Sequence, residues 1–142
     1  MIFLTITDFL LKISDDIRNQ ITGSDDAVLD DAEIHAMAVI QDALYQKYDL
    51  DAEFAKTGDN RHKNLLRWML NLALYFLYER IPDNQVPERV VKNYDDTVIE
   101  IKNIEIGKRN TSLAKLTRED NGRKETNVRW GSNKKRTLTP FD

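Results

Sequence analysis

An acidic cluster in the first quarter of the chain is the strongest candidate for metal chemistry. It comprises Asp25, Asp26, Asp30, Asp31 and Glu33. Calcium binds several oxygen ligands from a tight loop, typically an Asp-x-Asp-x-Asp-Gly series, and no such series occurs in this chain. Asp30 followed three residues later by Glu33 fits a helix capping box instead. We therefore expect helix caps and solvated charge here and no metal site, with calcium binding as the alternative.

The two histidines are the side chains best suited to acid–base catalysis near neutral pH. His35 and His62 are far apart in sequence, neither has a second histidine four residues away, and the chain has no cysteine. The sequence also lacks a nucleophile elbow, a phosphate-binding glycine loop and a zinc-protease histidine pair. We therefore expect no catalytic residues, no metal and no other cofactor. An enzyme built on dispersed carboxylates is the catalytic alternative.

The C-terminal segment carries the residues best suited to binding a charged partner. Residues 107–142 hold 10 Lys and Arg against 4 Asp and Glu, a charge of +6, whereas residues 1–106 hold 11 against 20, a charge of −9. Cations neutralise phosphates and aromatic rings stack on bases, so a nucleic-acid-binding arm is one interpretation. The acidic body of a neighbouring subunit is the other, and we favour it. The expected interface residues are Lys108, Arg109, Arg129, Trp130, Lys134, Lys135, Arg136 and Phe141.

Helices must position these charged residues, and the spacing of apolar side chains predicts four helices. The first runs from Ile6 to Ile21 and can break near Ser14. Thr5 followed by Asp8 predicts a capping box at its start, and Gly23 predicts its end. The residues at the N-terminus lack a basic region and a cleavage site, so we expect them to belong to the mature fold rather than to a signal peptide.

The second helix is expected to start at Asp30, with Glu33 completing the capping box, and to end near Tyr48. Its apolar residues predict a buried face on one side of the helix. The members of this face are Ile34, Met37, Ala38, Leu44, Tyr45 and Tyr48. An acidic connection, residues 49–59, follows the helix.

The third helix, from Leu65 to Tyr78, is the most hydrophobic segment of the chain. At about 1.5 Å per residue it spans roughly 21 Å, short of the ~30 Å hydrocarbon core of a membrane, so we expect a core helix. Its aromatic residues stand at helical spacing in an apolar run, which favours the core over a cofactor site. They are Trp68, Tyr75, Phe76 and Tyr78. The polar Arg67 and Asn71 are expected at the rim of the core or in a subunit contact.

Two prolines separate the third helix from a fourth. Pro82 disfavours helical geometry at the residue before it, whereas Pro87 is well placed at the start of the next helix. An apolar stripe follows, formed by Val90, Tyr94, Val98, Ile101 and Ile104. Gly107 predicts the end of this helix. The expected fold class is mainly α, with a four-helix packet as one domain (residues 1–107) and an extended, partly β C-terminal tail as a basic arm (residues 108–142).

Short motifs along the chain occur in the order found in a known protein family. They are Thr5-Ile6-Thr7-Asp8-Phe9, Val28-Leu29-Asp30-Asp31-Ala32-Glu33-Ile34, Leu77-Tyr78-Glu79-Arg80, Ile106-Gly107-Lys108 and Val128-Arg129-Trp130-Gly131-Ser132-Asn133. With these features the chain resembles the small head–tail connector proteins of tailed bacteriophages, in particular the Mu-like connector family. Two departures are the loop at residues 49–59, which lacks the proline-rich turn common in such proteins, and the unusually polar tail.

The resemblance implies a structural, non-enzymatic virion protein at the head–tail junction, made in the cytoplasm of the bacterial host. Its subunits would form a ring, expected to be a dodecamer, beneath the portal protein. The ring would let the genomic DNA pass and receive downstream neck or tail proteins, and the tail residues would contact neighbouring subunits or the portal. No membrane partner is implied.

A small helical DNA-binding or regulatory protein with a basic arm is the alternative. In that interpretation the second and third helices would form the DNA-reading unit. The acidic body argues against it, because a helix that faces DNA carries Lys and Arg, and the second helix has only Lys47 near its end.

Overall fold

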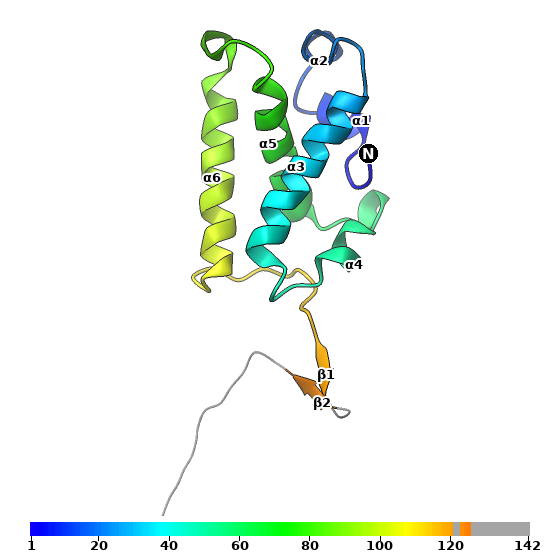
Figure 1. The fold of residues 1–142 in the computed structure, drawn as a ribbon, viewed down its shortest axis with the longest axis vertical. Coiled ribbons are helices and arrows are strands. Elements are labelled where there is room, and N and C mark those ends of the chain that lie inside the picture. Colours follow the sequence, from blue (N-terminus) through cyan, green and yellow to red (C-terminus); the bar gives the residue numbers. More distant parts are fainter. Residues whose placement is uncertain (121–122, 126–142) are drawn as a thin grey trace, which may run out of the picture.

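The computed structural model describes residues 1–120 and 123–125, and this part of the chain is mainly helical, which confirms the expected fold class (Figure 1). The helices are α1 (Ile6–Leu10), α2 (Asp15–Thr22), α3 (Ala27–Leu44), α4 (Leu50–Phe54), α5 (Lys63–Tyr78) and α6 (Glu88–Glu105), with 3-10 turns at Gly58–Asn60 and Asp83–Gln85. The strands β1 (Arg118–Asp120) and β2 (Arg123–Glu125) then pair antiparallel. None of the described helices is both long and apolar enough to cross a membrane.

Helix α5 is the centre of the core, as its hydrophobicity predicts. It packs against both α3 and α6, and α3 also contacts α6 (Figure 1). Ten of its sixteen residues are buried, including Trp68 and Leu72, which have no exposed surface. Fully burying a large apolar side chain stabilises a fold by about 1.5 to 3 kcal/mol, so α5 supplies much of the driving force for folding.

The predicted first helix is divided into α1 and α2. Its first residue and its last residue are capped by Thr5 and Gly23, as the sequence predicts. Ser14 separates α1 from α2 and accepts a hydrogen bond from the Ile17 N–H (3.3 Å). Thr5 and Asp8 form the expected capping box, with bonds of 3.2 and 2.8 Å. Gly23 ends α2 with φ of 65°, a left-handed conformation that glycine adopts without strain.

The predicted start of the second long helix is wrong. Helix α3 begins at Ala27, so Asp30 and Glu33 lie inside it and cannot cap its first turn. Glu33 is only 1% exposed, and its carboxylate accepts hydrogen bonds from three consecutive backbone N–H groups. These groups belong to Ile2, Phe3 and Leu4, at 2.6, 2.7 and 2.6 Å. Glu33 therefore fastens the N-terminal segment to α3.

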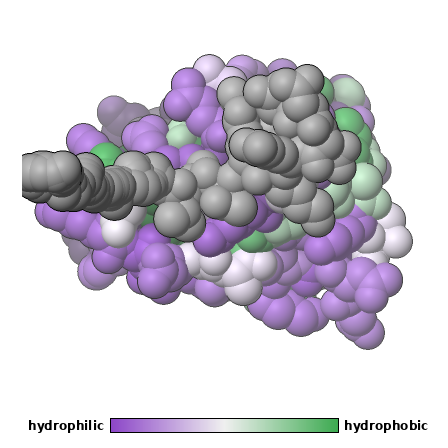
Figure 2. All heavy atoms as spheres, turned by 90° about the horizontal axis from the view of Figure 1, so that it is seen from below, coloured by the Kyte–Doolittle hydropathy of each residue, from purple (hydrophilic) through white to green (hydrophobic). Residues whose placement is uncertain are grey.

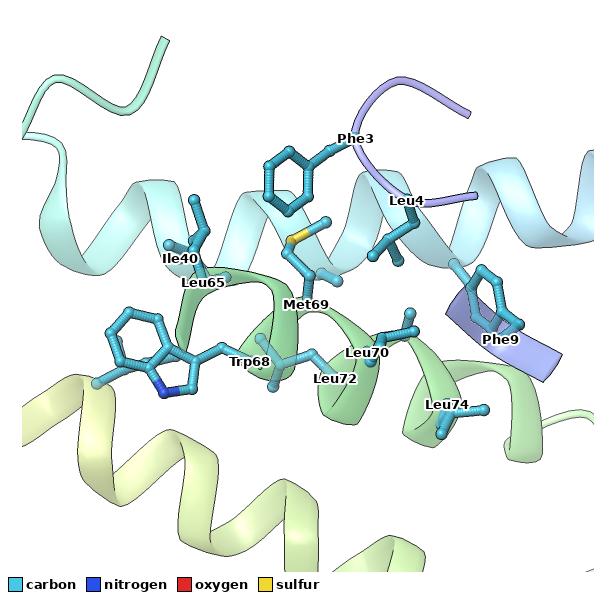
Figure 3. Packing of buried hydrophobic residues seen from close by; sticks show 14 of the residues in the cluster. Phe3, Leu4, Phe9, Ile40, Leu65, Trp68, Met69, Leu70, Leu72 and Leu74 are labelled. Carbon is cyan, nitrogen blue, oxygen red and sulfur yellow. The ribbon is translucent and has the colours of Figure 1, made fainter. Parts of the chain in front are cut away.

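Apolar packing and a second charge pair complete this attachment. Phe3 and Leu4 are buried, and Figure 3 shows Phe3 directed toward Met69 on α5. Arg61 donates to the Phe3 carbonyl oxygen (2.9 Å) and to both carboxylate oxygens of Asp8 (2.6 and 3.2 Å). The N-terminal segment is thus an integral part of the core.

Helix α3 is also rotated relative to the face predicted from its sequence. Its buried residues are Leu29, Ala32, Glu33, Ala36, Ile40 and Leu44. Leu44 and Tyr48 are buried as expected and Met37 is half-buried, but Ile34, Ala38 and Tyr45 face solvent. The prediction failed because the buried stripe contains a carboxylate and small alanines, whereas larger apolar residues lie on the outside.

Polar residues inside the packet have partners on α6. The expectation that Asn71 lies at a rim is wrong, because it is buried and donates to the Thr97 hydroxyl (3.0 Å). Arg67 does lie at the rim and forms an ion pair with Glu100 (2.8 Å).

Aromatic packing extends the contact between α5 and α6. Tyr75 stacks on Tyr94, with ring centroids 3.8 Å apart. The predicted α6 stripe is confirmed, since Val90, Ile101 and Ile104 are buried and the other two members are half-buried. Gly107 follows α6 with a φ of 84°, which only glycine adopts readily.

Replacing Leu70 by Ala tests the central position of α5. Leu70 is 4% exposed, so the substitution should lower the free energy of unfolding by about 2 to 5 kcal/mol. Leu11→Ala is the control, because Leu11 is 77% exposed and its loss should cost less than about 0.5 kcal/mol. Chemical denaturation of both variants measures the difference, and equal small losses would contradict this core assignment.

The Asp8–Arg61 pair makes stability depend on acid pH. Burial raises the pKa of the Asp8 carboxyl, but hydrogen bonds from Arg61 and Thr5 outweigh it and lower the pKa below its ordinary 3.8. The stabilisation is therefore complete above about pH 4 to 5 and is lost as the pH falls through the lowered pKa.

Asp8→Asn should remove this part of the acid dependence in melting curves recorded from pH 7 to pH 2. The exposed Asp59→Asn control should keep the pH profile of the unsubstituted protein. An unchanged acid profile in Asp8→Asn would show that the pair does not carry the effect.

Candidate functional site

The basic C-terminal segment leaves the packet at the end formed by the last turns of α3 and α6 (Figure 1). Residues 108–117, which we call the arm root, cross this end before β1 begins; we call residues 118–142 the arm. Figure 2 views the molecule from this end and shows a mainly hydrophilic surface with smaller hydrophobic areas. The position of the arm root on this end of the packet therefore sets the point from which the basic arm starts.

Backbone pairing holds the arm root to the segment between α3 and α4. The Ala114 carbonyl oxygen accepts from the Asp49 N–H (2.8 Å), and the Leu116 N–H donates to the Lys47 carbonyl oxygen (3.0 Å). These bonds flank an antiparallel bridge between Tyr48 and Lys115. Leu113 is buried in the same core cluster as α5, so the packed body extends to this point.

A buried carboxylate on α4 adds a further attachment. Glu53 accepts a hydrogen bond from the Ala114 N–H (3.0 Å) and forms an ion pair with Lys56 (2.5 Å). Burial raises the pKa of the Glu53 carboxyl, but the Lys56 and Ala114 hydrogen bonds outweigh it, so the pKa is lowered. Glu53 is thus ionised at neutral pH and holds the arm root as Glu33 holds the N-terminal segment.

His62 and Ser112 form a contact that resembles part of a catalytic pair. The His62 Nε2 and the Ser112 hydroxyl are 2.8 Å apart. His62 caps α5, however, and its Nδ1 accepts the Leu65 N–H (3.3 Å). A neutral imidazole whose Nδ1 accepts must carry its proton on Nε2, so it cannot take a proton from the serine. The pair ties α5 to the arm root, and sequence reasoning missed Ser112 because it has no motif.

Two of the eight expected interface residues lie within the described part of the chain. Lys108 and Arg109 are both exposed at the start of the arm root. Arg109 lies 3.4 Å from Glu100, which also pairs with Arg67 and accepts from the Trp68 indole (2.8 Å). Arg129, Trp130, Lys134, Lys135, Arg136 and Phe141 lie outside the described residues.

The acidic cluster at the start of α3 is dispersed among separate partners. Asp25 accepts the Ala27 N–H (3.0 Å), Asp30 binds the Met1 amino group (2.6 Å), and Asp31 lies 3.5 Å from His35. Glu33 is engaged by the N-terminal segment. Over the described residues no group of three or more acidic, histidine or cysteine side chains is arranged to hold a metal ion.

Leu113→Ala should loosen the arm root without unfolding the packet. Loss of this buried side chain should cost about 2 kcal/mol locally, or roughly thirtyfold faster hydrogen exchange at the amides of Ala114 and Leu116. Lys115→Ala is the matched control, because it removes an exposed side chain and keeps the backbone pairing. Equal exchange in both variants would show that Leu113 does not anchor this segment.

Comparison with protein families gives one match. Residues 3–129 match the family model described as Bacteriophage Mu, Gp36, a span that contains all six described helices, the arm root and the β1–β2 hairpin. No curated protein and no solved structure was found to be similar to the chain. Because the match covers most of the chain, the protein belongs to the Bacteriophage Mu, Gp36 family and is a phage protein, for which this family indicates a structural or morphogenetic role.

Proposed function

We propose that the protein is a subunit of the head–tail connector ring of a tailed bacteriophage and has no catalytic activity. The observation that carries this proposal is a basic arm whose root is fixed to the end of an acidic, tightly packed body. Membership in the Bacteriophage Mu, Gp36 family supports a role in the phage particle or its assembly. In this proposal the protein acts in the virion at the head–tail junction.

The fixed arm root gives each subunit a defined direction from which to reach a neighbour. The β1–β2 hairpin folds the chain back on itself, so only residues 126–142 add to the reach of the arm. An extended chain spans at most about 3.5 Å per residue, so these residues could reach up to roughly 60 Å. Helix α5 is about 24 Å long at 1.5 Å per residue. The arm is therefore long enough to cross the full height of an adjacent subunit or to contact the portal protein.

Charge and aromatic content suit the arm to a protein partner. In protein interfaces a few buried aromatic and arginine residues carry most of the binding energy, while charges at the rim steer association. Trp130 and Phe141 are the proposed anchors. The surrounding cations, Lys134, Lys135 and Arg136, would meet the acidic surface of another subunit or the portal. Lys108 and Arg109 complete the proposed interface at the arm root.

The proposed assembly is a closed ring, with twelve copies as the expected number, bound to the portal on one side. Downstream neck or tail proteins would bind the other side, and genomic DNA would pass through the centre. The acidic body favours this arrangement over stable DNA binding, because α3 has no Lys or Arg and the body carries a charge of −9.

Removing the arm tests the proposal. A chain ending at Thr117 keeps Leu113 and its contacts, so it should remain folded with a nearly unchanged melting temperature. It should nevertheless fail to form rings or bind the portal, as judged by native mass spectrometry. A full-length Thr137→Ala, Thr139→Ala variant is the control and should assemble normally.

DNA binding measured on the same proteins separates the two interpretations of the arm. Binding of the full-length protein to duplex DNA should be weak and lost at physiological salt, because the acidic body offers few phosphate contacts. Normal assembly of the truncated chain, together with tight DNA binding by the full-length protein at physiological salt, would replace the connector proposal with the nucleic-acid alternative.

A further inference from the structure

An apolar stripe on the outer face of α3 is open to solvent. Ile34, Ala38, Gln41 and Tyr45 recur at intervals of four, three and four residues, and Tyr45 continues the helical geometry as the C-cap. Ile34 and Tyr45 are 56% and 59% exposed. Residues three and four apart lie on one face of a helix, so these side chains form one continuous stripe.

The outer face of α6 carries a stripe with the same spacing. Asp95, Ile99, Lys102 and Ile106 also recur at intervals of four, three and four, and Ile106 is the C-cap. Ile99 and Ile106 are 58% and 54% exposed. A repeat of three and four residues is the spacing at which two helices pack side by side at a shallow angle.

The two helices are also matched in length, direction and height. Each has 18 residues. Figure 1 shows both running from the same end of the packet to the other, with α3 inclined relative to α6 and their ends at similar heights. A rotation about the long axis of the packet preserves height. It would therefore place α3 of one copy beside α6 of the next copy with equivalent turns facing each other.

We infer that the outer stripe of α3 packs against the outer stripe of α6 from a neighbouring copy, and that this contact joins subunits side by side. At equal height, Ala38 faces Ile99, Tyr45 faces Ile106, and Gln41 lies beside the aliphatic stem of Lys102. A contact between two different surfaces is heterologous, and it closes into a ring when the rotation fits. The inference rests on the proposed ring and supplies its lateral interface.

Charge favours this pairing over pairing of like helices. The ionised side chains of α3 are all acidic, and Asp31 and Asp42 are exposed beside its stripe. On α6, Lys102 is exposed on the stripe and forms no ion pair with any residue that the structure describes, whereas Lys92 is paired with Asp96 on its own helix (2.7 Å). Equal height brings Lys102 toward Asp42. Two α3 faces would instead oppose carboxylates.

Cysteine crosslinking tests the contact directly, because the chain has no cysteine of its own. A full-length variant with Ala38→Cys and Ile99→Cys should form a ladder of disulfide-linked multimers on oxidation. Each single variant alone should not crosslink, whereas a mixture of the two single variants should give only dimers. Disulfides need Cα atoms about 4.4 to 6.8 Å apart, so Ala38→Cys combined with Glu88→Cys, three turns away from Ile99, should not form the ladder.

Charge exchange gives a second measurement that does not depend on crosslinking. Asp42→Lys should raise the concentration needed for half-assembly by at least about tenfold, and adding Lys102→Asp should reverse most of that change. The melting temperature of each variant checks that these exposed substitutions leave the fold intact.

The possible outcomes distinguish a failure of the proposed α3–α6 contact from a failure of the connector proposal on which it rests. Rings in native mass spectra without crosslinking between positions 38 and 99 would overturn the α3–α6 contact and leave the connector proposal standing. Dimers of the Ala38→Cys variant alone would also overturn it in favour of an α3–α3 contact. A protein that stays monomeric at every concentration, with and without a portal protein, would overturn both.

Discussion

Helix α5 is apolar on almost every side, and the described part of the chain is arranged to cover it. Helices α3 and α6 cover two sides, and α2 and the N-terminal segment cover more of the helix. The arm root adds Leu113 to the same core. Neither the N-terminal segment nor the arm root is helical where it contacts the core. The backbone N–H and C=O groups of each segment therefore need hydrogen-bond partners other than those that a helix provides.

Two buried carboxylates supply those partners. Glu33 on α3 satisfies three N–H groups of the N-terminal segment, and Glu53 on α4 satisfies one in the arm root. A buried carboxylate is costly unless it is hydrogen-bonded or paired, and each of these is. Hydrogen bonds to a buried carboxylate thus attach both the N-terminal segment and the arm root to the helical packet, and they fix the point from which the basic arm departs.

The sequence predicted the features that depend on local patterns. The long apolar run of α5, the capping box of Thr5 and Asp8, and the glycines that end α2 and α6 all follow from residue type and spacing. The family resemblance placed the chain among phage proteins, as the family match shows. The sequence could not reveal that Glu33 and Glu53 are buried and accept backbone hydrogen bonds. Their partners are N–H groups about 30 and 61 residues away in the chain.

The same limit explains the error on α3. Ile34 and Tyr45 are large apolar residues and were therefore expected in the core. The face of α3 that is buried instead contains Glu33, whose carboxylate accepts hydrogen bonds from the backbone of the N-terminal segment. The large apolar residues therefore remained on the surface. Their exposure, together with that of Ile99 and Ile106 on α6, is a property that sequence reasoning missed and that the proposed ring would use.

In the proposed connector ring, the acidic body, the basic arm with its fixed root and the two matched outer stripes would join copies of the protein. Electron-microscopy class averages of the purified full-length protein, alone and with a portal protein, test this claim most directly. The account predicts closed rings of uniform size with a central opening wide enough for duplex DNA. Monomers, isolated dimers or open filaments under both conditions would contradict it.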